Sequence, residues 1–160
     1  MTIRSFTRSD FPAILDIYAH SKLDELIHEK KTFKLIPLNQ DEKRLAQLKA
    51  SDIYVYEVEN NIIAYGAVFN HKNSEDRTFN NEIRALFVHP HHRKQGIAQQ
   101  LLKHLLKNMN GSADLYVAKS NQNAKALYEK FGFEISDEFE TEYGGVSVIA
   151  NKMTLHIHSL

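Results

Sequence analysis

The sequence predicts an α/β fold built on a mixed sheet, and three observations support this class. Segments rich in β-branched and aromatic residues alternate with segments whose apolar residues recur every three or four positions. In chain order they are a strand, helices, three strands, a helix, a strand, a helix and two strands, which is an α/β order. The 160 residues are 42% hydrophobic and 25% charged, which is enough to bury a core. Because neither a repeat nor a linker divides the chain, we expect one domain over residues 1–160.

The first half of the chain should form a strand, several helices and a hairpin. The expected elements are a strand at 3–6, a helix from 11, helical turns within 21–39, a helix at 40–50 and hairpin strands at 53–58 and 62–69. Ser9 or Asp10 is placed to cap the first helix, which has Pro12 in its first turn. Gly66 inside a strand indicates a bulge or a close approach of the backbone to a neighbour. Residues 70–80 are polar and should form a loop.

The second half should alternate strands and helices and then end in a hairpin. The expected elements are a strand at 82–88, a helix at 96–109, a strand at 113–118, a helix between 121 and 132, and strands from 133 and at 146–155. Ser120 or Asn121 caps the second of these helices, and Gly132 follows it in the usual glycine position. Gly144-Gly145 is the expected turn of the last hairpin.

Composition excludes several classes of function. Twenty basic and twenty acidic residues cancel, so no global field attracts nucleic acid or an anionic membrane. The chain has no cysteine, which excludes disulfides, a thiol nucleophile and a cysteine zinc site. The first residues lack the apolar core of a signal peptide, and no apolar run approaches the roughly 20 residues of a membrane span. We expect a cytoplasmic protein with neither membrane nor nucleic acid as a partner.

The stretch HPHHRKQGIAQQLL, residues 89–102, allows three interpretations: a metal site, a basic patch for nucleic acid, or a cradle for a phosphate. A metal site needs His89, His91 and His92 to converge, but side chains one or two positions apart diverge, and no carboxylate lies in the stretch. We therefore expect solvated histidines and no metal.

The phosphate interpretation has a clearer physical basis. A strand ending at Val88 leads through a short loop into a helix that begins near Arg93-x-x-Gly96-x-Ala98. The first turn of a helix has unpaired N–H groups, and its dipole favours an anion there. Gly96 and Ala98 project little, so a diphosphate can reach the backbone. A basic loop that leads into an ordinary helix is the alternative.

Two blocks of the sequence resemble the GNAT N-acetyltransferases. The first is Arg93-x-x-Gly96-x-Ala98 after a strand ending in V-x-P, and the second is Asn121-x-x-Ala124-x-x-Leu127-Tyr128-x-x-x-Gly132-Phe133. The resemblance covers roughly residues 53–155, and the earlier part matches by element order only. It implies a mostly antiparallel sheet of about seven strands with about four flanking helices, splayed between strands 4 and 5. It also implies acetyl-CoA as cosubstrate.

The resemblance further implies which residues bind acetyl-CoA. The pantetheine arm would pair with the backbone of Leu86, Phe87 and Val88. Asn121 would bind the pantetheine or cap its helix, and Ala124 and Tyr128 belong to the same block. The residues whose amides would hold the pyrophosphate are Arg93, Lys94, Gln95, Gly96, Ile97, Ala98 and Gln99.

The same resemblance assigns the catalytic residues for acyl transfer from a thioester to an amine. The N–H of Val88 would stabilise the oxyanion, and Tyr128 would be the general acid for the departing thiolate, its alternative being a core tyrosine. Glu82, at the start of its strand, would be the base for an ammonium of pKa ~10.4, or else a solvated carboxylate. Tyr116 occupies the position of a glutamate in some relatives, which counts against a close match to the ribosomal-protein N-terminal acetylases.

The acceptor site should lie between residues 21–39 and the hairpin segment 136–145. The hairpin carries Asp137, Glu138, Glu140 and Glu142, which favour a cationic acceptor or form a solvated face. Phe33, Phe139 and Tyr143 could wall the groove. A non-catalytic acyl-CoA-binding module is the alternative function. The C-terminal strand 146–155 is apolar enough for a homodimer, so we expect a monomer or a homodimer.

Overall fold

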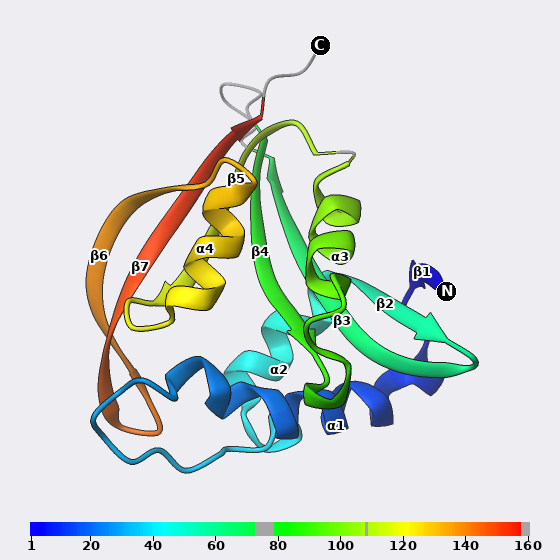
Figure 1. Cartoon of the computed structure of the whole chain (residues 1–160), viewed down its shortest axis with the longest axis horizontal. Coiled ribbons are helices and arrows are strands. Elements are labelled where there is room, and N and C mark those ends of the chain that lie inside the picture. The colour runs from blue at the N-terminus through cyan, green and yellow to red at the C-terminus, as the bar shows by residue number, and fades with distance from the viewer. Residues whose placement is uncertain (73–78, 108, 158–160) are drawn as a thin grey trace.

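A seven-stranded sheet forms the centre of the computed structural model, which describes residues 1–72, 79–107 and 109–157 (Figure 1). The strand order is β1-β2-β3-β4-β5-β7-β6, and every neighbouring pair is antiparallel except the parallel pair β4–β5. The strands are β1 (Thr2–Ser5), β2 (Asp52–Val58), β3 (Asn61–Lys72), β4 (Phe79–Val88), β5 (Gly111–Ala118), β6 (Glu134–Tyr143) and β7 (Val146–Ile157). The predicted fold class and order of elements are confirmed.

Four α-helices flank this sheet: α1 (Phe11–Ser21), α2 (Glu42–Lys49), α3 (Ile97–Leu106) and α4 (Gln122–Lys130). Short 3-10 turns connect them: η1 (Arg8–Asp10), η2 (Lys22–Leu26), η3 (Leu38–Gln40) and η4 (Pro90–His92). Among the described residues, no helix has the length and apolar character needed to cross a membrane.

The helices cover the two faces of the sheet separately. On one face, α1 and α2 bury residues such as Ile14 and Leu48 against Tyr65 and Phe87. On the other face, α3 and α4 pack against a cluster that includes Leu102, Leu105, Leu115 and Phe133. Strands β3 and β4 alternate their side chains between these two clusters, as buried strands between two helical layers do.

Several boundaries differ from the sequence prediction. Strand β3 runs to Lys72 and strand β4 begins at Phe79, so both ends of the polar stretch expected as a loop, 70–72 and 79–80, are paired strand. Residues 73–78 lie outside the described part. Helix α3 begins at Ile97 rather than 96 and ends at Leu106. Residue 108 of the predicted helix also lies outside the described residues.

Gly66 marks a close approach between the sheet and α3. A Cβ added at Gly66 would lie 2.9 Å from Leu105 Cδ1, closer than side-chain atoms pack. The missing side chain therefore lets α3 lie against β3, as the sequence suggested.

Asp10 precedes α1, but its carboxylate bonds elsewhere. It accepts hydrogen bonds of 2.8 Å from the Thr7 amide and from both terminal nitrogens of Arg4. The guanidinium of Arg4 lowers the pKa of Asp10 to about 2 despite the burial of the carboxyl. Asp10 thus joins β1 to the start of α1 rather than capping α1 with its side chain.

Candidate active site

Strands β4 and β5 pair at one end only. Their parallel register covers three pairs, from Asn80↔Ser112 to Glu82↔Asp114. The buried side chain of Asn81 donates hydrogen bonds of 2.9 Å to the carbonyls of Asn110 and Ser112, which fastens this end. Beyond it the two halves of the sheet separate toward α1, as Figure 1 shows. The predicted splay between strands 4 and 5 is confirmed.

The free side of β4 presents backbone groups to this opening. The His89 amide donates to the Ile63 carbonyl at 2.8 Å, so the backbone of His89 faces β3. Because bonding alternates along an antiparallel ladder, Phe87 also faces β3, whereas Leu86 and Val88 face the opening. Phe87 therefore differs from the expectation: its backbone serves the sheet, and its ring packs 5.6 Å from the rings of Tyr18 and Tyr65.

The loop after β4 leads into α3, whose first turn is not capped by a side chain. Lys94 and Gly96 have φ values of 62° and 76°, the left-handed region, so the chain leaves helical geometry there and α3 starts after them. No side chain caps α3, and the first intrahelical bond runs from the Gln100 amide to the Gly96 carbonyl at 3.1 Å. A Cβ at Gly96 would meet nothing within 4 Å. Among the described residues, the amides of Ile97, Ala98 and Gln99 have no backbone acceptor, so they are the unpaired donors of a helix start, which is the geometry that binds a phosphate.

The side chain of Arg93 forms a tether at the end of β4. Its guanidinium pairs with Asp24 at 2.5 Å, and its Nε donates to the Val88 carbonyl at 3.3 Å. The same carbonyl accepts from Ser21 Oγ at 3.3 Å. Arg93 and Ser21 therefore link α1 and η2 to the end of β4, and the backbone role expected of Arg93 toward a pyrophosphate stays a prediction.

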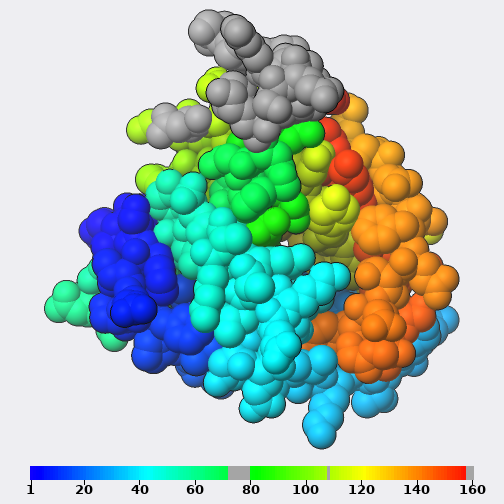
Figure 2. Space-filling view, turned by 180° about the vertical axis from the view of Figure 1, so that it is seen from behind, coloured from blue at the N-terminus to red at the C-terminus, as the bar shows by residue number. Residues whose placement is uncertain are grey.

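A pocket of about 200 Å³ opens where the two halves of the sheet separate. Helix α2, strand β4 and strand β5 meet around it, on the face seen in Figure 2 as cyan, green and yellow-green surfaces. Its lining brings together the predicted Glu82, Leu86, Phe87 and Tyr128, with Tyr116 beside them. It also holds charged residues that the sequence analysis missed: Lys22, Glu25, Arg44 and Arg84.

Glu82 lies inside β4 rather than at its start, since the strand begins at Phe79. Its carboxylate lies 3.6 Å from Arg84 Nε and 3.6 Å from His71 Nε2. Its side chain keeps 27% of its exposure, so water and a small amine can reach it from the pocket.

Tyr128 lies on α4, and its ring packs against that of Phe133 at 5.8 Å. Burial raises the pKa of the Tyr128 phenol well above its usual range. The hydroxyl is therefore protonated at neutral pH and available as a hydrogen-bond donor at the pocket.

Asn121 caps α4. Its Oδ1 accepts a hydrogen bond from the Ala124 amide at 3.3 Å, which closes the first turn of the helix. Of its two predicted roles, capping is the one present in the structure. Gly132 follows the helix with φ 96°, as expected of a C-terminal glycine.

The acidic hairpin lies beside the pocket without lining it. The Phe139 ring is 5.7 Å from the ring of Tyr116, and the Tyr143 ring is 5.6 Å from Lys22 Nζ and from Arg44 Cζ. None of Asp137, Glu138, Glu140 and Glu142 lines the pocket, nor do Phe33, Phe139 and Tyr143. Tyr143 is buried instead, and its hydroxyl accepts a hydrogen bond from the Ile36 amide at 2.8 Å. It secures the segment between η2 and η3 to β6.

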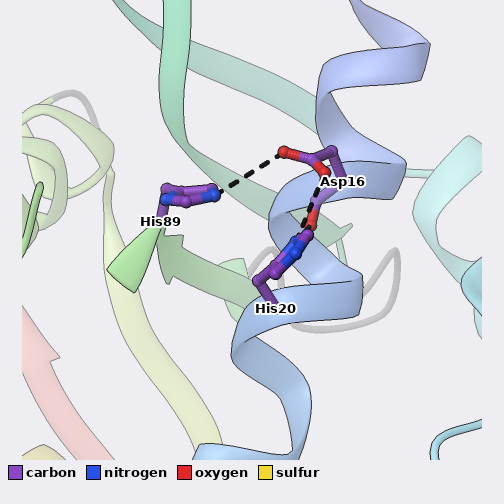
Figure 3. Close-up of side chains that lie close together, drawn as sticks. All are labelled: Asp16, His20 and His89. Atoms are coloured by element: carbon purple, nitrogen blue, oxygen red, sulfur yellow. Dashed lines mark hydrogen bonds and ion pairs between the residues drawn. The ribbon is translucent and has the colours of Figure 1, made fainter. Parts of the chain in front are cut away.

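The loop histidines do not diverge as predicted. The turn η4 brings the rings of His91 and His92 to 4.8 and 6.2 Å from that of His89. Moreover, His89 meets Asp16 and His20 of α1, and one ligand atom from each of the three lies within 4.8 Å of the others (Figure 3). The i, i+4 spacing of Asp16 and His20 was a readable signal, but only the fold brings His89 beside them.

The comparisons with known proteins agree with this geometry. Residues 49–135 match the family model described as an acetyltransferase (GNAT) domain. No curated protein matches the chain.

Several solved structures share the fold. A ribosomal-protein-alanine N-acetyltransferase from Brucella melitensis is 21% identical, with a TM-score of 0.74, over 98% of this chain and 100% of that one. The ribosomal-protein-S18-alanine N-acetyltransferase of Escherichia coli is 22% identical, with a TM-score of 0.72, over 99% and 95%. A putative acetyltransferase from Salmonella typhimurium, solved with its cofactor acetyl-CoA, is 19% identical, with a TM-score of 0.74, over 100% and 95%. The family model spans more than half of the sequence, and the splayed mixed sheet with an uncapped helix after its fourth strand agrees with it. The chain therefore belongs to the GNAT acetyltransferase family.

Proposed function

We propose that the protein is an acetyl-CoA-dependent N-acetyltransferase that joins the acetyl group to a primary amine by direct attack within a ternary complex. One observation carries the proposal: the pocket at the splay of β4 and β5 collects Glu82, Tyr128 and the free edge of β4. A nucleophile, a thioester and a leaving group can therefore meet at one point.

The substrate acetyl-CoA fits the two backbone features beside this pocket. Its diphosphate would accept hydrogen bonds from the amides of residues 97–99. Its pantetheine arm would pair with Leu86 and Val88, whose backbone groups face the opening. The Val88 N–H then lies on the side from which it can donate to the oxyanion that forms on the thioester carbonyl.

The acceptor amine must lose a proton to attack. We infer that Glu82 accepts this proton, directly or through water, because it is the β4 carboxylate that reaches the pocket. The amine nitrogen then bonds to the carbonyl carbon, the carbon–sulfur bond breaks when the oxyanion collapses, and the nitrogen releases its second proton to water.

Tyr128 would stabilise the departing sulfur. A thiol has a pKa of about 8.5, well below that of a buried phenol, so complete proton transfer to the thiolate is uphill. We therefore infer that Tyr128 donates a strong hydrogen bond to the thiolate, which takes its proton from water on release.

The acceptor itself should carry both charges. The pocket lining includes two carboxylates, Glu25 and Glu82, and three cations, Lys22, Arg44 and Arg84. Each cation already has a carboxylate partner: Lys22 pairs with Glu25 at 2.7 Å, Arg44 with Asp41 at 3.3 Å and Arg84 with Glu82 at 3.6 Å. Because this balanced set offers no excess of carboxylates to a polyamine, we expect amines that also bear a carboxylate to be better acceptors than polyamines.

Thiol release from acetyl-CoA over an amine panel tests the function. We expect turnover that depends on an amine and that Tyr128→Phe lowers by about 100-fold, the lower range for loss of one hydrogen-bond donor to a developing negative charge. Tyr54→Phe, at a tyrosine outside this pocket, is the matched control and should leave turnover unchanged.

A non-catalytic acyl-CoA-binding module would behave differently. It would bind coenzyme A in calorimetry, release no thiol with any amine, and be indifferent to substitution of Glu82 and Tyr128. That pattern would overturn the enzymatic proposal.

A further inference from the structure

We propose that Asp16, His20 and His89 form a binding site for a divalent transition-metal ion of the zinc class. The site lies where α1 meets the end of β4, outside the acetyl-transfer pocket, and it does not depend on the proposed function. Asp16 and His20 stand one helical turn apart, so both project from the same face of α1. His89 approaches them from the residue after β4, as Figure 3 shows.

The distances between donor atoms suit a small coordination sphere. His20 Nδ1 lies 3.3 Å from Asp16 Oδ1, and His89 Nε2 lies 3.6 Å from Asp16 Oδ2. Bonds of about 2.0–2.1 Å from zinc to its ligands give a tetrahedron with edges of about 3.3–3.4 Å. The two measured distances end on different oxygens of Asp16; taken through one atom per residue, the three ligand atoms lie within 4.8 Å of one another. The side chains of Asp16 and His20 are more than half exposed, so both can rotate to bring the three atoms to the required spacing.

The chemistry of the donor set points the same way. Two imidazoles and one carboxylate make a three-ligand site that leaves a position for water, and this set is typical of zinc and of other late first-row ions. The rings of His91 and His92, beside that of His89, offer a fourth ligand. No sulfur ligand is present, which disfavours ions that select thiolates.

Existing hydrogen bonds set the cost of binding. His20 Nδ1 lies 2.9 Å from the Asp16 carbonyl, and the His91 amide donates to His89 Nδ1 at 3.2 Å. A metal on His20 Nδ1 and His89 Nε2 displaces the first bond and, because the proton of His89 must then sit on Nδ1, the second as well. This cost predicts a modest affinity. The bound ion would cross-link α1 to the loop that leads into α3, so it should also stabilise the fold.

The test uses the untagged full-length chain, titrated with zinc by calorimetry and with cobalt by visible absorption. We expect one ion per chain, a cobalt spectrum typical of nitrogen and oxygen ligands, and a thermal unfolding midpoint that rises with zinc. His20→Asn and Asp16→Asn should each weaken binding by at least about tenfold. His156→Asn, at an exposed histidine of β7, is the matched control and should bind like the unchanged chain.

Three outcomes would overturn the proposal. They are no saturable binding by the unchanged chain, undiminished binding by His20→Asn and Asp16→Asn, or an equal loss in His156→Asn. Because cobalt absorption reports the ligands directly, neither the amine specificity nor the activity of the protein affects the result.

Discussion

Helices α3 and α4 each follow a strand and a short loop, yet they begin differently. Helix α4 starts under Asn121, whose side chain accepts the Ala124 amide. Helix α3 begins after Gly96, which has no side chain to accept a hydrogen bond. The φ of Gly96 is 76°, so its backbone is left-handed rather than helical. The first turn of α4 is satisfied within the protein, whereas that of α3 is open.

The difference indicates that a helix start can bind an anion when no side chain caps its first amides. Both helices have a dipole, and both lie on the same face of the sheet. Of these two helices, α3 is the one whose first amides lack a partner beside the splayed strands. Substitutions that fill the start of α3, or that alter a start the protein already fills, test this difference.

The largest effect should come from Gly96→Glu. A carboxylate at the open helix start repels a diphosphate, and juxtaposed like charges cost several kcal/mol, so coenzyme A should bind at least about 100-fold more weakly. Calorimetry with coenzyme A measures this change.

Gly145→Glu is the matched control. Its φ of 80° is close to that of Gly96, and a Cβ there also meets nothing within 4 Å. Both variants should lose about 1–2 kcal/mol of folding stability from left-handed strain. Equal coenzyme A affinities for the two would contradict the role of α3.

Asp10→Asn should remove the ion pair with Arg4 that joins β1 to the start of α1. The pKa of Asp10 falls from 3.8 to about 2 on folding, chiefly through Arg4, which corresponds to about 2 kcal/mol at neutral pH. Because the folded-state pKa is lowered, this stability is present above pH ~4 and disappears as the pH falls through ~2. Denaturant unfolding of both proteins between pH 7 and pH 2 should show the gap closing. A gap that stays constant with pH would assign the loss to packing.

Asn121→Ala should empty the cap of α4 at a cost of about 1 kcal/mol in the free energy of unfolding. Asn121→Asp keeps an acceptor at the cap and should retain most of the stability. If Asn121 only caps, coenzyme A affinity stays unchanged in Asn121→Asp. A marked drop there would instead support a contact between its amide and pantetheine.

The smallest effect should come from Gln99→Glu in the first turn of α3. A negative charge there interacts favourably with the helix dipole and with Lys130, whose Nζ already lies 3.3 Å from Gln99 Oε1. We expect a gain of about 0.5 kcal/mol in stability together with weaker coenzyme A binding. If Gln99→Glu raised both the folding stability and the affinity for coenzyme A, the first turn of α3 would not be a site for an anionic ligand.

The parts of the fold that could be predicted are those that depend on residues close together in the sequence. The leucine stripe of α3, the cap at Asn121 and the turn at Gly144-Gly145 each depend on neighbours in the sequence, and the structure has all three. The misplaced boundaries involve residues whose local preference was overruled. Asn70 and Asn80 were expected in a loop, but they lie in the paired strands β3 and β4, where the ladder satisfies their backbone groups.

The site divides in the same way. The expected phosphate cradle is continuous in the sequence, so the local pattern was enough to single out Gly96, and the family resemblance supplied the role expected of Val88. The pocket charges Lys22 and Arg44, the tether from Ser21 to Val88 and the contact of His89 with α1 join residues far apart in the chain. Their positions follow from tertiary packing, which no local pattern encodes.

The early divergence of β4 from β5 means that the empty protein has a sheet edge in its interior. The Leu86 backbone and the Val88 N–H form an edge that can recruit a strand from another chain, which is a route to aggregation, whereas the Val88 carbonyl is already bonded to Ser21 and Arg93. A ligand that lies along this edge would act as a missing strand and protect it. At 100 times its dissociation constant such a ligand adds about 2.7 kcal/mol of stability, so the supply of acyl-CoA would help to set how long the folded chain survives.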